Sequence, residues 1–129
     1  MNQKSKEVIS KLLLYHKACC RAMGYVDLRW DKERKQIYAV SCPSARTSER
    51  VDNVQFKPKL GYYGLILQVD SYLEKLLPEE REAIFYAYIC KFMNKAGHIE
   101  YTCIARKMNT DAKTVRKLIK SAIRKMTRE

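Results

Sequence analysis

The chain has 129 residues and a formal net charge of +12, from 26 Lys and Arg against 14 Asp and Glu. This length predicts one domain, or a compact domain with an arm, that can bury a hydrophobic core. The longest apolar run, residues 83–90, is too short to span a bilayer, and the polar N-terminus is unlike a signal peptide. We therefore expect a cytoplasmic protein without a membrane segment.

The positive charge is concentrated in the first and last parts of the sequence. Residues 102–129 contain nine Lys and Arg against two acidic residues, a net of +7, and residues 1–25 have a net charge of +4. Residues 61–101 contain four basic and six acidic residues, a net of −2. Such asymmetry indicates that the partner is a nucleic acid or, less often, an anionic membrane surface.

The first predicted element is a helix over residues 4–23, which Gly24 should end. Its apolar side chains recur at alternating spacings of four and three, at Val8, Leu12, Tyr15, Cys19 and Ala22. Core packing is the simplest role for this stripe. A dimer seam is the alternative, although barely two heptads are short for a coiled coil.

Alternation of apolar and polar residues then predicts a small hairpin after residue 25. Its first strand would contain Val26, Leu28 and Trp30. Two registers are open for the second strand, which would place opposite them either Ile37 and Ala39 or Tyr38 and Val40. An isolated two-stranded ribbon is marginal in water, so the hairpin needs packing against the rest of the chain.

Residues 41–61 contain two of the three prolines and predict a loop or extended arm. A helix with an apolar stripe follows over residues 62–76, and Pro78 suits the first turn of the next one. That helix is apolar almost all round, which indicates a buried scaffold, and Gly97 is expected to end it in a left-handed conformation. The predicted fold is therefore all-α, with an N-terminal helix and a hairpin or loop arm in residues 1–61 and a helical domain in residues 62–129.

Residues 101–120 have the spacings of a helix-turn-helix. Ala105 is small where two helices must nearly touch, and Asn109 stands where the turn needs positive φ. Asp111 is placed to cap the second helix, because its carboxylate can accept a hydrogen bond from the free amides of the first turn. The inward positions of the two helices are Ile104, Met108, Val115 and Leu118.

The second helix of this motif, predicted over residues 112–126, is apolar on one side and basic on the other. Its apolar stripe contains Val115, Leu118, Ile119, Ala122, Ile123 and Met126. A helix of this kind in a helix-turn-helix enters the major groove by its N-terminal residues. The alternative interpretation is a solvated basic face without a partner.

Five cysteines, an odd number with no C-x-x-C pair, fit a reducing compartment. Neither His16 nor His98 lies at zinc-finger spacing from them, so we expect no metal site. Cys19, Cys90 and Cys103 fall in apolar helical patterns and are most simply small core residues. The sequence also lacks a Gly-rich phosphate loop, an H-E-x-x-H motif and a nucleophile beside a base. We expect no catalytic residues and no cofactor, and therefore no enzyme.

Residues 77–88 read L-P-E-E-R-E-A-I-F-Y-A-Y, and residues 104–126 read I-A-R-K-M-N-T-D-A-K-T-V-R-K-L-I-K-S-A-I-R-K-M. This pair of segments resembles the region-four domain of bacterial sigma factors. The residues that carry the resemblance are Leu77, Glu80, Arg81, Glu82, Ile104, Ala105, Met108, Thr114, Val115, Arg116, Ala122, Arg124, Lys125 and Met126. The chain departs from that family at Asn109, where Gly is favoured, and at Asp111, where Ser is favoured. Nothing upstream resembles the sigma region that melts promoter DNA.

The whole arrangement is also similar, in architecture only, to small phage-encoded transcriptional regulators of the ArpU and RinA kind. The sigma resemblance implies a set of DNA-binding residues. Base-edge or phosphate candidates are Lys113, Arg116, Lys117 and Lys120. Polar candidates are Thr114 and Ser121, and Ala112 lies at the start of the same helix. Phosphate candidates, which position the helix without specifying sequence, are Arg106, Lys107, Arg124 and Lys125.

The predicted function is sequence-specific regulation of transcription on double-stranded DNA, by a homodimer in the cytoplasm of a bacterial host cell. The resemblance to phage regulators implies control of late or packaging genes, and host RNA polymerase is a further candidate partner. Two alternatives stay open. One is a DNA-packaging subunit similar to a small terminase, and the other is a sigma-like module that docks on RNA polymerase without reading DNA.

Overall fold

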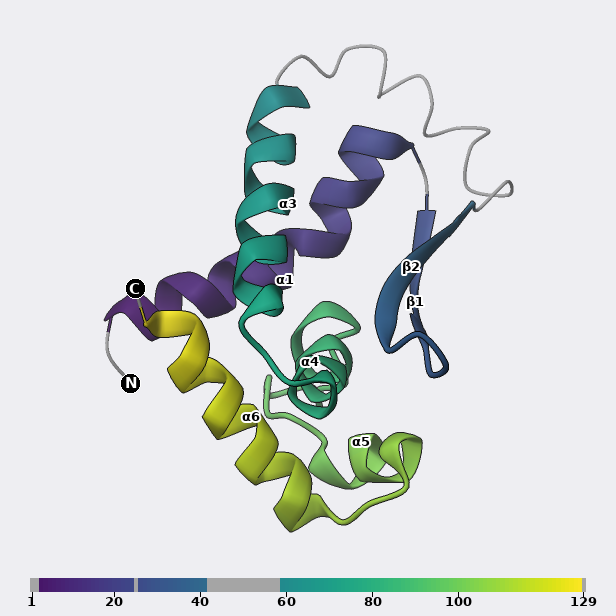
Figure 1. Cartoon of the computed structure of the whole chain (residues 1–129), viewed down its shortest axis with the longest axis vertical. Helices are drawn as coiled ribbons and strands as arrows, with labels where there is room; N and C mark the ends of the chain where they lie inside the picture. The colour runs from purple at the N-terminus through teal and green to yellow at the C-terminus, as the bar shows by residue number, and fades with distance from the viewer. Residues whose placement is uncertain (1–2, 25, 42–58, 129) are drawn as a thin grey trace.

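The computed structural model describes residues 3–24, 26–41 and 59–128. These residues form five α-helices, one π-helical segment and a two-stranded hairpin, which confirms the predicted helical class (Figure 1). The elements are α1 (Gln3–Met23), β1 (Val26–Asp31), β2 (Gln36–Ser41), α3 (Lys59–Glu74), α4 (Pro78–Ile84), η2 (Phe85–Ile89), α5 (Tyr101–Met108) and α6 (Ala112–Thr127).

The first helix and the hairpin lie where the sequence predicts them. Gly24 follows α1 with a φ of +91° and closes its last turn, as expected of a residue without a Cβ atom. In the antiparallel hairpin, Trp30 pairs with Ile37 and Leu28 pairs with Ala39. Of the two registers left open by the sequence, the structure therefore has the one that uses Ile37 and Ala39.

The predicted loop over residues 41–61 is too long at both ends. Ser41 is the last residue of β2, and α3 already begins at Lys59. Residues 42–58, which make up most of this prediction, lie outside the described residues.

One hydrophobic core joins the N-terminal helix to the C-terminal helices. α1 packs against α3, α6 and η2, and α3 crosses it in Figure 1. Leu12 of α1, Val69 of α3 and Val115 of α6 are all fully buried in this core. The apolar stripes of α1 and α3 thus cover each other, and the predicted segments 1–61 and 62–129 share a single core.

The scaffold helix ends earlier than predicted. α4 passes at Phe85 into the π-helical turn η2, where the Cys90 amide donates to the Phe85 carbonyl at 2.8 Å. Lys91 then takes a φ of +59° and the chain leaves the helix. Gly97 does have positive φ, +84°, but it lies in the turn between Met93 and Ile99, which form an isolated bridge. Because residues 83–89 are all buried, their apolar pattern has no polar side from which the end of the helix could be predicted.

The helix-turn-helix is confirmed in its geometry. Asn109 ends α5 in the left-handed conformation, with φ 56° and ψ 47°. The Thr110 amide donates to the Ala105 carbonyl at 2.9 Å, and this bond satisfies one of the carbonyl groups at the C-terminal end of α5. Asp111 caps α6 by accepting a hydrogen bond from the Thr114 amide at 2.7 Å. The predicted inward residues are buried or half-buried between the two helices.

A buried carboxylate connects α4 to α6. Glu80 is only 2% exposed, and it accepts hydrogen bonds from the Leu77 amide at 2.8 Å, from the Ser121 hydroxyl and from the Lys125 ammonium at 2.8 Å. Burial by itself would raise the pKa of Glu80. The hydrogen bonds from Lys125, Ser121 and Leu77 outweigh this effect and hold that pKa below its usual value. Glu80 is therefore a charged, fully partnered anchor for α6.

The turn can be tested at Asn109. Asn109→Gly should leave the free energy of unfolding unchanged or raise it slightly, because Gly adopts positive φ without a steric penalty. Asn109→Val should lower it by about 1 kcal/mol or more, since a β-branched residue is strained there. Chemical denaturation of both variants measures the difference. Equal stabilities would contradict a left-handed turn at this position.

The anchor can be tested by comparing two glutamates of the first turn of α4. Glu80→Ala should lower the free energy of unfolding by about 2–4 kcal/mol, because it removes the buried partner of Ser121, Lys125 and the Leu77 amide. The exposed neighbour Glu79 is the matched control, and Glu79→Ala should cost less than about 0.5 kcal/mol. Similar losses for the two variants would show that Glu80 contributes only through helix propensity.

Acid should weaken the same anchor. The folded pKa of Glu80 lies below its usual value of 4.5, so the carboxylate stabilises the fold fully above that pH and loses its contribution as the pH falls through the folded pKa. Unfolding free energies of the wild-type protein and Glu80→Gln, measured from pH 7 downward, should therefore converge below about pH 4.5. The comparison with Glu80→Gln is needed because the pKa of Asp111 is also lowered, by its hydrogen bonds with Thr114. A constant difference between the two proteins at every pH would contradict the assignment.

Candidate nucleic-acid interface

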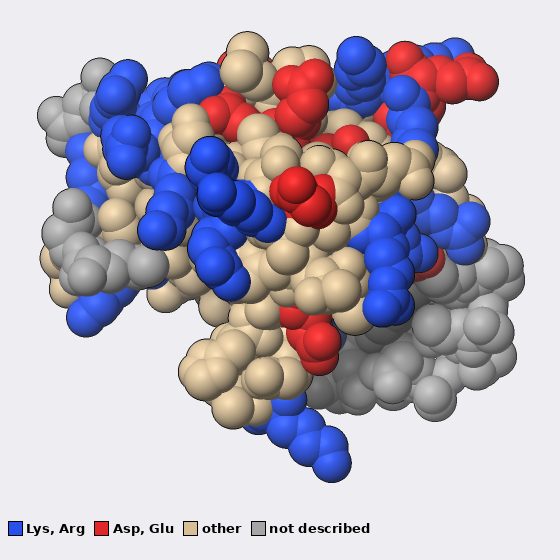
Figure 2. Space-filling view, turned by 90° about the horizontal axis from the view of Figure 1, so that it is seen from below, with Lys and Arg blue, Asp and Glu red and all other residues tan. Residues whose placement is uncertain are grey.

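The exposed side of α6 carries a set of cations that we call the basic face: Lys113, Arg116, Lys117, Lys120 and Arg124. α6 contains no acidic residue, and its other side is closed against the core by Val115, Ile119, Ala122 and Met126. In Figure 2, Lys and Arg side chains crowd the left part of the molecule, the side on which α6 lies in Figure 1. Asp and Glu lie mainly toward the centre and the upper right of that view. The structure thus presents a row of cations on a helix packed against the core, and none of these cations forms an ion pair with another of the described residues.

The first turn of α6 is held by its cap. Asp111 accepts from the Thr114 amide, and hydrogen bonds with Thr114 lower the pKa of Asp111, so that the cap is charged at neutral pH. Lys113 and Thr114 are exposed, and Ala112 is half-buried. In a recognition helix, the side chains of the first turn reach the base edges. In α6 this turn therefore carries one small side chain, one hydroxyl and one cation.

Arg116 has an aromatic contact that the sequence did not predict. Its guanidinium lies over the ring of Tyr101, the first residue of α5, at 4.8 Å from the ring centroid. A cation over an aromatic face is attracted by the ring quadrupole, and the contact restricts the rotamers of a long side chain. Arg116 stays exposed, so its donors are available while its direction is constrained. Tyr101 could not be recognised as its partner from spacing, because the two residues belong to different helices.

Two of the predicted DNA contacts, Ser121 and Lys125, form hydrogen bonds within the protein. Both are half-buried and hydrogen bonded to Glu80, as described above. Lys125 keeps 30% of its side chain exposed, but its ammonium forms an ion pair with a carboxylate that is 3% exposed. These two residues therefore position α6, whereas their neighbour Arg124 remains on the basic face.

The first helix of the motif adds Arg106 and Lys107, both exposed near the C-terminal end of α5. The hairpin meets α5 at the same end, because the Lys32 ammonium donates to the Lys107 carbonyl at 2.7 Å. A cation at this end of a helix is favoured by the helix dipole. Lys32 is a residue that sequence reasoning missed: it lies in a charged turn, and only the tertiary structure brings that turn beside α5.

Among the described residues outside α6, one histidine has a backbone partner and two cysteines are shielded by burial. His16 contacts the Val26 carbonyl through its Nε2 atom at 3.0 Å, and burial raises the pKa of both Cys19 and Cys90 to about 11. Cys103, in contrast, is exposed on α5, so its predicted place in the core is wrong. Within residues 3–24, 26–41 and 59–128, no three His, Cys, Asp or Glu residues are grouped as a metal site would require. Among the helices of the described residues, none combines the length and the apolar composition that a membrane span requires.

Comparison of this chain with protein-family models, with curated proteins and with solved structures finds no match. The resemblance to sigma region four thus rests on the residues quoted for it. The geometry of α5, the turn and α6 is what indicates a function.

Proposed function

We propose that this protein is a sequence-specific regulator of transcription that binds double-stranded DNA through α6. The observation that carries the proposal is the combination of a helix-turn-helix turn at Asn109 with the basic face of α6. A helix that is fully buried on one side and cationic on the other suits the major groove, where Arg and Lys recognise guanine O6 and N7.

The placement of the candidate residues divides them into two groups. Reading residues belong to the first turns of α6 and are Ala112, Lys113, Thr114, Arg116, Lys117 and Lys120. Positioning residues, which would contact phosphates, are Arg106, Lys107 and Arg124. Ser121 and Lys125 leave the DNA-binding set in this proposal, because the Ser121 hydroxyl donates to Glu80 and the charge of Lys125 is paired with the same carboxylate.

Further parts of the proposal concern partners and setting. A homodimer would place two copies of α6 in successive major grooves about one helical turn apart. The buried stripes of α1 and α3 face each other, so the dimer contact would use the surface outside them. The sigma resemblance favours host RNA polymerase as a second partner. The phage-regulator resemblance favours a role in the control of late or packaging genes, in the cytoplasm of the host cell.

Selection of bound duplexes from a random pool, followed by affinity measurements at one stated salt concentration, tests the function. Arg116→Ala or Lys117→Ala should cost about 1–3 kcal/mol on the preferred site and flatten the preference among sites. Arg124→Ala should weaken binding to every duplex alike and reduce the salt slope by about one, because it removes a phosphate contact.

Two controls separate DNA contact from folding and from bulk charge. Lys95→Ala removes the same charge from an exposed turn outside α5 and α6 and should leave the preference unchanged. Lys125→Ala should lower the free energy of unfolding, because it breaks the pair with Glu80. If all α6 substitutions weakened specific and random duplexes equally, the sequence-specific regulator would be excluded. A large ring by measured mass would then favour the packaging subunit, and capture of polymerase from nuclease-treated lysate would favour the docking module.

A further inference from the structure

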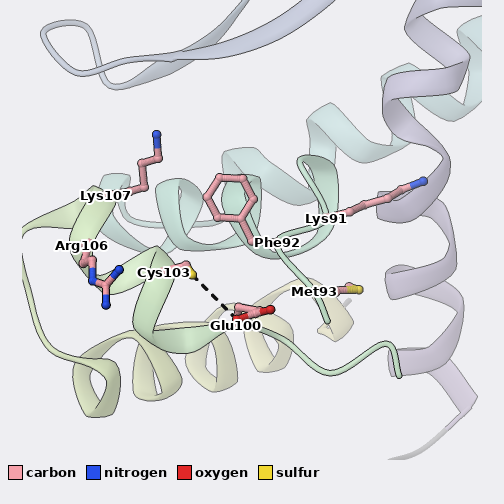
Figure 3. Close-up of a pocket in the computed structure, with 7 residues that line it drawn as sticks. All are labelled: Lys91, Phe92, Met93, Glu100, Cys103, Arg106 and Lys107. Carbon is pink, nitrogen blue, oxygen red and sulfur yellow. Dashed lines mark hydrogen bonds between the residues drawn. The ribbon is translucent and has the colours of Figure 1, made fainter. Parts of the chain in front are cut away.

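A groove of about 520 Å³ lies between α5 and the segment that follows η2. Its size falls in the range of small-molecule sites, roughly 300–1,000 Å³. Seven residues line it: Lys91, Phe92, Met93, Glu100, Cys103, Arg106 and Lys107. In Figure 3 the ring of Phe92 lies between Lys107 on one side and Lys91 on the other, with Cys103 and Glu100 below it.

The apolar part of the groove is fixed by the backbone and by ring packing. The Phe92 amide donates to the Tyr86 carbonyl at 3.0 Å, and the Glu100 amide donates to the Phe92 carbonyl at 2.8 Å. The ring of Phe92 stacks on that of Tyr86 with 5.6 Å between centroids. Phe92 and Met93 are only half-buried, although the folded chain holds them in place. The floor is thus preformed and has apolar surface left to cover.

The rim of the groove is predominantly cationic. Lys91, Arg106 and Lys107 are exposed, and none of them forms an ion pair with another of the described residues. The one acidic residue, Glu100, lies 3.8 Å from the Cys103 thiol through its Oε2 atom. A ligand that complements both parts of the groove carries a negative charge toward the rim and an apolar body against the floor.

We propose that the groove is a binding site for a small amphipathic anion, with an alkyl or aromatic body and one carboxylate or comparable group. The body covers Phe92, Met93 and Cys103, and the flexible stems of Lys91 and Lys107 let their ammonium groups approach the anionic end. The site does not depend on the proposed DNA function. Because Arg106 and Lys107 are also phosphate candidates, Lys91 is the residue through which the groove is tested separately.

Alkylation of Cys103 by iodoacetamide reports occupancy directly, since this thiol is exposed and lines the groove. The probes are decanoate, decanol and decyltrimethylammonium below their micellar concentrations, with the modified cysteine identified by peptide mass. Decanoate should slow the alkylation of Cys103 saturably, at a concentration about fivefold lower than decanol requires, and the cationic probe should not protect. The alkylation rate of half-buried Cys20 should stay constant, which excludes unfolding by the probe.

A pair of charge reversals supplies the matched control. Lys91→Glu should remove most of the preference for decanoate over decanol, whereas Lys95→Glu, an equal change at an exposed residue that does not line the groove, should leave it intact. Equal protection by the three probes would reduce the groove to an apolar surface and overturn the proposal. No protection by decanoate, or the same loss in both variants, would overturn it as well.

Discussion

The carboxylate of Glu80 lies between α4 and α6, and the position of the basic face depends on it. A buried charge is tolerated only when its hydrogen-bonding capacity is satisfied, and Glu80 has three donors: a backbone amide, a hydroxyl and an ammonium. Two of these donors belong to α6, so a rotation or slide of α6 along the core would leave the carboxylate with only the Leu77 amide as a partner. The apolar stripe of α6 supplies most of its burial, and Glu80 adds directional contacts that set how α6 is turned.

This constraint explains how a short, strongly charged helix can keep its cations outward. Five Lys and Arg side chains follow one another on the exposed side of α6 and repel each other in the absence of a polyanion. The fold offsets this repulsion by pairing Lys125 with Glu80 and by placing Arg116 over the Tyr101 ring. Both contacts leave the first two turns of α6 accessible. If α6 binds DNA through these turns, the charges that destabilise the free protein contribute affinity in the complex.

The groove beside α5 follows from a different feature, the early end of the scaffold helix. Because the chain leaves η2 at Lys91, Phe92 returns toward Tyr86 and forms the floor beside Cys103. A helix continued to Gly97 would have carried these side chains along its axis instead. The π-helical turn and the positive φ at Lys91 therefore create both the connection to α5 and the apolar surface beside it.

The sequence by itself determined the elements whose signals are local. The α1 helix and its glycine stop, the left-handed turn at Asn109 and the cap at Asp111 each depend on residues within a few positions of one another, and each is found as predicted. Only the tertiary structure decided the roles of Ser121 and Lys125, because Glu80 is 41 and 45 residues away from them in the chain. The sequence likewise did not determine where the scaffold helix ends, that Cys103 is exposed, or that Lys32 contacts α5. Periodicity tells which side of a helix is apolar, but the element that covers each side, and the polar groups it brings, come from packing between distant segments.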